Sequence, residues 1–162
     1  HLNLWIDCSG SFCNNEDSVN TLLTSLADIE KRNSNFTFDL ILCGNGVQVT
    51  DRKKRWLKTG GGNCLVIDDV KKVYQDMQKR NTVNYNIILF DGDCGACGFS
   101  SRKHTSKNAL RVFDNNNCFL IMEEDNKQYL NVIKTAKYEI VNSDYPAKLQ
   151  ELIVKVLGIA FR

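Results

Sequence analysis

The stretch LWIDCSGSF, residues 4–12, joins an apolar run to a group of oxygen-bearing side chains. The run Leu2–Ile6 is typical of a strand that is buried on both faces. It stops at Asp7, and Ser9 and Ser11 follow at once in a D-x-S-G-S pattern. The pattern therefore predicts a strand that presents one carboxylate and two hydroxyl groups at its carboxyl end.

Helical and strand patterns alternate along the rest of the chain. Apolar residues at helical spacing predict amphipathic helices over Glu16–Arg32, from Ile67 to Met77 and from Leu149 to Leu157. Phe36–Leu42 alternates between large apolar and mostly smaller or polar residues, which predicts a half-buried strand. The other expected elements are strands at Val47–Thr50, Asn86–Phe90, Cys118–Met122 and Tyr138–Val141, and a short helix around Tyr129–Ile133.

This alternation predicts an α/β fold of three layers, Rossmann-like, with a mostly parallel central sheet. Gly44-Asn45-Gly46 is typical of a tight hairpin, so the strand after it is expected to run antiparallel at one edge. A chain of 162 residues suits a single domain, residues 1–162. In such sheets ligands bind beyond the carboxyl ends of the strands, which is where Asp7 and Asp91 are expected to lie.

Overall composition does not by itself indicate a nucleic-acid-binding or membrane protein. A net charge of +2 is too small to indicate binding to nucleic acid or to a membrane surface, and no apolar run is long enough to cross a bilayer. The seven cysteines form no small-domain disulfide framework, so we expect reduced thiols in a cytoplasmic protein.

Two further loops carry side chains of the same hard-oxygen chemistry. Thr59-Gly60-Gly61-Gly62-Asn63 precedes a predicted helix, and Asp91-Gly92 follows a predicted strand. Divalent cations such as Mg²⁺ prefer oxygen ligands in near-octahedral geometry. Gly10 is expected to let the backbone turn tightly between the two serines of the first loop.

These three loops, in this order, resemble those of the von Willebrand factor A family. The metal-ion-dependent adhesion site of that family consists of a D-x-S-x-S loop, a threonine in a second loop and an aspartate in a third. The resemblance covers nearly the whole chain and looks nearest to bacterial intracellular members, which are often linked to MoxR-type ATPases. It implies a non-enzymatic module that binds an acidic residue of another protein through the cation.

Carried over by position, Asp7, Ser9 and Ser11 match the first loop, and Asp91 matches the third. Asn63 stands where the family usually has threonine, and its carbonyl oxygen is the expected substitute ligand. The resemblance implies Mg²⁺, or Mn²⁺ or Ca²⁺, as the cofactor and implies no catalytic residue. The residues expected to face the partner are Gly10, Gly92 and the aromatic anchor Trp56.

Three alternatives remain open from the sequence. Cys94 and Cys97 form a C-x-x-C pair after a strand, which indicates a thiol-disulfide oxidoreductase. The same pair, with Cys8 and Cys13 from the first loop, could hold zinc. The basic stretch Arg52–Lys58 is compatible with a phosphate backbone, which would make the chain a nucleic-acid-binding module.

Overall fold

The computed structural model describes residues 1–60, 66–80, 82–90, 102–123, 127, 130–141 and 144–160. Within these ranges six strands form one sheet in the order β3-β2-β1-β4-β5-β6. Every neighbouring pair is parallel except β2 with β3, which confirms the α/β class and the antiparallel edge strand. The strands are β1 (Leu2–Asp7), β2 (Phe38–Gly44), β3 (Gly46–Val49), β4 (Tyr85–Phe90), β5 (Cys118–Glu123) and β6 (Lys137–Val141).

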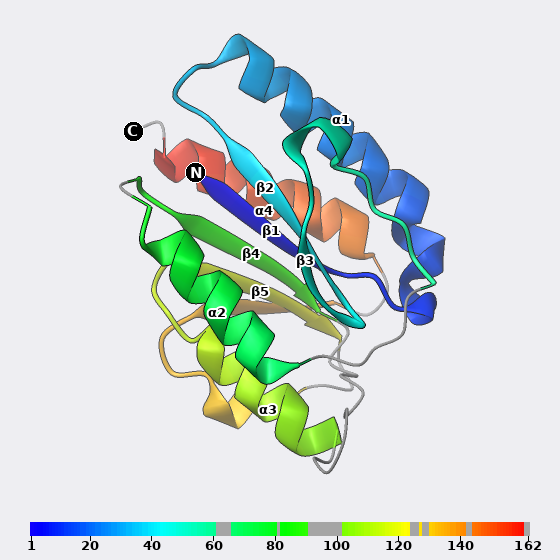
Figure 1. The fold of residues 1–162 in the computed structure, drawn as a ribbon, viewed down its shortest axis with the longest axis vertical. Coiled ribbons are helices and arrows are strands. Elements are labelled where there is room, and N and C mark those ends of the chain that lie inside the picture. Colours follow the sequence, from blue (N-terminus) through cyan, green and yellow to red (C-terminus); the bar gives the residue numbers. More distant parts are fainter. Residues whose placement is uncertain are drawn as a thin grey trace.

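Helices cover both faces of the sheet (Figure 1). α1 and α4 bury their apolar residues against Leu2, Leu4 and Ile6 of β1. α2 and α3 pack on the opposite face, where Trp5 of β1 is fully buried. The helices are η1 (Gly10–Asn15), α1 (Glu16–Arg32), η2 (Arg52–Lys54), α2 (Ile67–Gln78), α3 (Arg102–Val112) and α4 (Tyr145–Ala160).

α1 has the bounds that the sequence predicts. Val19, Leu23 and Leu26 recur at helical spacing and are buried in the core that α1 shares with β1. Acidic residues lie in the first turn and basic residues in the last turn, where their charges complement the helix dipole. The apolar periodicity and the charges at both ends therefore indicate the same start and end of the helix, which is why its bounds could be predicted.

Three elements differ from the prediction. β2 is more than half-buried, because β1 and β3 flank it, helices cover both faces, and ion pairs allow Asp39 to be buried. α3 was not predicted, because its composition is mostly polar and its apolar residues, Ala109, Leu110 and Val112, are confined to its last turn. The short helix expected around Tyr129–Ile133 is reduced, in the described part, to a 3-10 turn over residues 130–132.

β1 lies at the point where the winding of the sheet reverses. β2 and β3 extend the sheet on one side of β1, and β4, β5 and β6 extend it on the other side. The loops that leave β1 and its neighbours at such a point diverge and open a crevice beyond the carboxyl ends. Asp7, the last residue of β1, lies at this edge.

Candidate functional site

The first loop brings Asp7 and Ser9 together at the carboxyl edge of the sheet. Asp7 aligns with Cys43 of β2, and both Asp7 and Ser9 are almost fully buried. The backbone N–H of Ser9 donates to Oδ1 of Asp7 at 2.6 Å, a local turn that fixes the direction of the carboxylate. The Ser9 backbone therefore contacts the Asp7 carboxylate directly, and both residues are buried at the same edge of the sheet.

η1 continues the first loop directly. Ser9 has an extended backbone, with φ −63° and ψ 164°, and the helix begins at Gly10. Gly10 is exposed, lacks a positive φ, and would have open space around an added Cβ. The chain turns at Gly10, as expected, but the turn does not use a backbone conformation that favours glycine. Ser11 lies in η1, and its side chain is outside the described part of the structure.

The second loop is anchored to α1 before it reaches the glycine run. Glu16 Oε2 accepts the backbone N–H of Thr59 at 2.8 Å and its hydroxyl group at 2.5 Å. One helical turn later, Asn20 donates to the carbonyl of Leu57 at 2.9 Å and accepts its N–H at 2.7 Å. Gly60 follows with φ +93°, a conformation in which a side chain is strained.

A cavity of about 400 Å³ opens between the two loops and the β2–β3 hairpin. Its lining includes Cys8 from the first loop, Gly46 from the hairpin and Thr59 from the second loop. One of its lining residues, Cys8, directly follows Asp7, so the cavity opens at the same edge of the sheet as Asp7. A partner side chain could therefore approach this edge without displacing core residues.

Thr59→Val is expected to raise the pKa of Glu16 towards its ordinary value. The Thr59 hydroxyl is the largest cause of the lowered pKa of Glu16, followed by the Thr59 backbone N–H, which valine retains. Because the pKa is depressed in the folded state, this anchor stabilises the fold at neutral pH and is lost as the pH falls through that pKa. A ¹³C NMR titration of the Glu16 carboxyl measures the shift.

The control for this prediction is Thr21→Val. Thr21 lies on the exposed side of α1, and its hydroxyl donates to the Asp17 carbonyl within the same helix. This change should leave the pKa of Glu16 where it is. If Thr59→Val also leaves it there, the hydrogen bond from the Thr59 hydroxyl does not form in solution.

Two thiols lie close to Asp7, and both are held protonated. Burial raises the pKa of Cys8, and the negative charge of Asp7 raises it further. Burial, Asp7 and Cys8 likewise raise the pKa of Cys43. The zinc cluster of Cys8, Cys13, Cys94 and Cys97 stays a prediction, because Cys94 and Cys97 lie outside the described residues.

Several predicted site residues fall outside the described residues. Asp91, Gly92, Cys94 and Cys97 lie in the segment 91–101, and Asn63 lies in the segment 61–65. Their roles as metal ligands, partner contacts or redox thiols therefore stay predictions. Among the residues that the structure does describe, no three His, Cys, Asp or Glu side chains gather into a metal-binding group.

The described part of the first loop nevertheless fits a hard cation by its donor chemistry. Asp7 offers a carboxylate and Ser9 a hydroxyl group, and both are withdrawn from solvent at the carboxyl edge of the sheet. Both are oxygen donors of the kind that Mg²⁺ takes. Ser11, Asn63 and Asp91 would have to supply the remaining protein oxygens.

The basic stretch Arg52–Lys58 is partly neutralised by ion pairs. Arg52 Nε lies 3.0 Å from Asp39 Oδ1, and the guanidinium of Arg55 pairs with Glu30. Two of the five cationic side chains in this stretch therefore form ion pairs within the protein, which reduces the positive charge available to a phosphate backbone. Trp56 is 57% exposed and is the large apolar side chain that this segment offers to a partner.

The residues that hold the second loop in place were not predicted from the sequence. Glu16 and Glu30 look like ordinary surface charges of an amphipathic helix. Asn20 gave a usable signal, because it lies three residues before Leu23 and hence on the buried face of α1. A buried amide on an apolar face requires hydrogen-bond partners, and here they come from the backbone of Leu57.

Comparison with known proteins gives matches in structure alone. No protein-family model matches the chain, and no curated protein does. Within the described residues, no helix has both the length and the apolar character needed to cross a membrane. The comparison of this chain with known proteins therefore rests on its fold.

Three solved structures share that fold. A von Willebrand factor type A protein from Catenulispora acidiphila matches with a TM-score of 0.54 and 14% identity, over 98% of this chain and 41% of that one. Proximal thread matrix protein 1 of the mussel byssus gives 0.58 and 14%, over 96% and 47%. A D319A mutant of the PilB minor pilin from Streptococcus sanguinis gives 0.59 and 11%, over 98% and 61%.

The match extends along the whole sheet and its helices, since at least 96% of this chain is aligned in each case. The chain spans about half the length of these structures, between 41% and 61%. Identities of 11–14% establish the fold alone. The chain therefore has a von Willebrand factor A-like fold.

Proposed function

We propose that this chain is a protein-binding domain that recognises a carboxylate of its partner through a divalent cation at the carboxyl edge of the sheet. Asp7, Ser9 and Ser11 would hold the cation, with Asn63 and Asp91 completing the protein ligands. Mg²⁺ is the expected ion, and Mn²⁺ or Ca²⁺ could replace it. When bound, the cation supplies positive charge and an open coordination position for the partner's carboxylate.

The observation that supports this proposal most strongly is the buried pair of Asp7 and Ser9. Both oxygen-bearing side chains are less than 6% exposed, and the Ser9 N–H fixes the Asp7 carboxylate from one side. Their place at the winding reversal of the sheet is the general ligand-binding position of α/β folds. The von Willebrand factor A-like fold supports the same site, because that family binds its cation at this edge.

The chain's own residues would perform the remaining tasks. Glu16 and Asn20 hold the segment that leads into the second loop, so that loop starts from a fixed point. Trp56 presents an apolar surface on this anchored segment, since the next residue, Leu57, is fully buried. A partner that binds the ion could therefore also contact Trp56 on a segment whose backbone is already fixed, which lowers the ordering cost of binding.

The proposal includes a reducing, intracellular setting, as expected from the cysteine pattern of the sequence. Cys8, Cys13, Cys43 and Cys118 all carry free thiols. Protein thiols persist in this form where the compartment is reducing. An association with MoxR-type ATPases rests on the sequence resemblance and is part of the same proposal.

Mg²⁺ is expected to raise the thermal unfolding midpoint of the wild type but not that of Asp7→Asn. An ion present at about 100 times its dissociation constant adds about 2.7 kcal/mol to the free energy of unfolding. Asparagine keeps an oxygen acceptor for the Ser9 N–H but removes the charge, so the local turn survives while cation affinity falls. Differential scanning fluorimetry in EDTA and then in rising Mg²⁺ measures both midpoints.

Asp68→Asn is the matched control for this experiment. Asp68 lies in the first turn of α2 with its side chain 91% exposed, so the change removes one equal charge from the surface. This variant should respond to Mg²⁺ as the wild type does. Equal Mg²⁺ responses in wild type and Asp7→Asn would place any bound ion elsewhere and refute the proposed site.

A further inference from the structure

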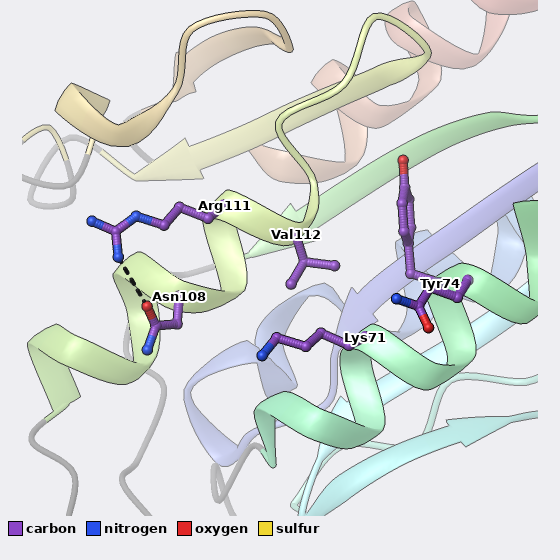
Figure 2. A pocket seen from close by; sticks show the side chains of 6 residues that line it. Lys71, Tyr74, Asn108, Arg111 and Val112 are labelled. Atoms are coloured by element: carbon purple, nitrogen blue, oxygen red, sulfur yellow. Dashed lines mark hydrogen bonds between the residues drawn. The ribbon is translucent and has the colours of Figure 1, made fainter.

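A second hollow lies on the opposite side of the sheet from α1, between α2 and α3. Its volume is about 520 Å³, within the range of small-molecule and peptide side-chain sites. Figure 2 shows that its side chains come from both helices and that none belongs to the proposed cation site. The α2–α3 groove is lined by Lys71, Tyr74, Gln75, Asn108, Arg111 and Val112.

The α2–α3 groove carries positive charge from both of its helices. Lys71 comes from α2 and Arg111 from α3, and both are exposed. Arg111 donates through Nη1 to Asn108 Oδ1 at 3.0 Å and makes no ion pair within the described residues. Lys71 lies 3.6 Å from Asp68, but both side chains are more than half exposed, so water screens this pair.

α3 contains no acidic residue that could neutralise the groove. Its sequence, RKHTSKNALRV, has four Lys or Arg residues. Asp76, on α2, is paired with Lys79 at 3.0 Å on the exposed surface rather than with a groove residue. The groove therefore offers two cations that a negatively charged ligand can neutralise.

The inner part of the groove is apolar and rigid. Tyr74 lines the groove but is only 8% exposed, and its hydroxyl group is turned into the protein, 3.5 Å from Cys118 Sγ. Phe113 fixes this ring in an edge-on contact, with a centroid distance of 5.8 Å. Val112 adds a second apolar surface from α3.

We propose that the α2–α3 groove binds an acidic peptide segment of a partner protein. One apolar side chain of the peptide would lie against Tyr74 and Val112, and flanking carboxylates would pair with Lys71 and Arg111. A carboxylate matches the fork of the Arg111 guanidinium, which Asn108 already orients. Two cations on separate helices, with an apolar surface in the same groove, fit a segment with spaced charges better than one compact phosphate.

The test is an NMR titration of the ¹⁵N-labelled chain with the peptide acetyl-Asp-Glu-Leu-Leu-Glu-Asp-amide. Amide signals of α2 and α3 should shift and saturate, and the neutral peptide acetyl-Asn-Gln-Leu-Leu-Gln-Asn-amide should leave them unchanged. Lys71→Glu and Arg111→Glu should each weaken binding about tenfold, because each replaces an attraction with a repulsion. EDTA and Asp7→Asn should change nothing, which separates this site from the proposed cation site.

Lys72→Glu is the matched control. Lys72 is an exposed neighbour on the same helix that does not line the groove, and its reversal changes the net charge equally. Circular dichroism verifies that each variant is folded before it is titrated. Three outcomes overturn the proposal: no saturable shift up to about 1 mM peptide, an equal loss with Lys72→Glu, or saturation with inorganic phosphate but not with the peptide.

Discussion

Glu30→Ala is expected to destabilise the folded chain by about 3–5 kcal/mol, because it leaves the buried guanidinium of Arg55 without its counter-charge. The Arg55 side chain is 7% exposed and that of Glu30 is 19% exposed, so water screens this pair little. Glu30 also accepts the N–H of Phe38 at 3.1 Å, and the Arg55 guanidinium lies 3.6 Å from the Phe38 ring centroid. Urea unfolding at neutral pH measures the loss.

The same ion pair sets a pH dependence. Burial of Glu30 opposes ionisation, yet the hydrogen bonds from Arg55 and Phe38 and the charge of Arg55 hold the pKa of Glu30 below its ordinary value. A depressed folded-state pKa contributes stability above the unfolded-state value, and that contribution disappears as the pH falls through the folded pKa. The difference in the free energy of unfolding between the wild type and Glu30→Ala should therefore become smaller at acidic pH.

Two further variants make the Glu30 result interpretable. Asp28→Ala, two residues earlier on α1, removes an exposed ion pair with Lys31 and should cost less than about 1 kcal/mol. The double variant Glu30→Met with Arg55→Met should recover most of the loss, because an apolar pair leaves no charge uncompensated. A Glu30→Ala loss as small as that of Asp28→Ala would show that the Arg55 guanidinium is solvated in solution.

Asn20→Ala is expected to cost about 2–4 kcal/mol, because it orphans two buried backbone groups, each worth about 1–3 kcal/mol. Asn20 is 2% exposed and its amide pairs with both the N–H and the carbonyl of Leu57, which is itself fully buried. Asn20→Asp separates the two bonds, since a carboxylate can still accept the Leu57 N–H but cannot donate to its carbonyl. Urea unfolding gives the global effect, and hydrogen exchange of the Leu57 amide gives the local one.

Thr21→Ala, at the next position of α1, is the comparison for Asn20. Its hydroxyl donates to a carbonyl of its own helix on the exposed side, so the change should cost less than about 0.5 kcal/mol. Leu57 exchange should accelerate in Asn20→Ala and stay unchanged in Thr21→Ala. If Leu57 exchanges equally slowly in both variants, the second loop is held by other contacts and the assigned role of Asn20 is wrong.

Periodic apolar residues made much of the fold predictable from the sequence. The expected helix Glu16–Arg32 agrees at both ends, and the Gly44-Asn45-Gly46 hairpin is confirmed, with Gly46 at φ +86°. Both signals are local: one is a helical period with charged ends, and the other is a turn that favours glycine. Local rules suffice where a segment's own sequence decides its backbone.

Tertiary pairing explains what the sequence analysis missed. Asp39 looked like the polar side of a half-buried strand, but Arg52 and Arg80 neutralise it and allow it to be buried. α3 was missed because the sheet supplies its burial through a few residues such as Leu110. Glu30 gave no sign of its partner Arg55, since no local pattern connects positions so far apart in the chain.

For the candidate site, sequence reasoning located Asp7 and Ser9 at the end of the first strand because an apolar run that stops at an acid is a local pattern. It did not reveal that Glu16 would engage Thr59, because this contact depends on how α1 crosses the second loop. Gly10 does lie at a turn, the start of η1, but that turn does not use the conformational freedom of glycine, since its φ is not positive.

The central place of β1 has a consequence for the order of folding. Leu2 at the start of β1 pairs with Phe38 on one side and with Tyr85 on the other. β1 can therefore pair fully only after segments that are much later in the chain have been synthesised. The entropy cost of closing these long loops comes before the strand contacts that offset it. Sheets of this kind are therefore slow to assemble. A nascent chain therefore exposes Asp7 long before that residue has its native neighbours. A ligand that requires the assembled edge binds after these strand pairings have formed, so it is expected to slow unfolding rather than to speed folding.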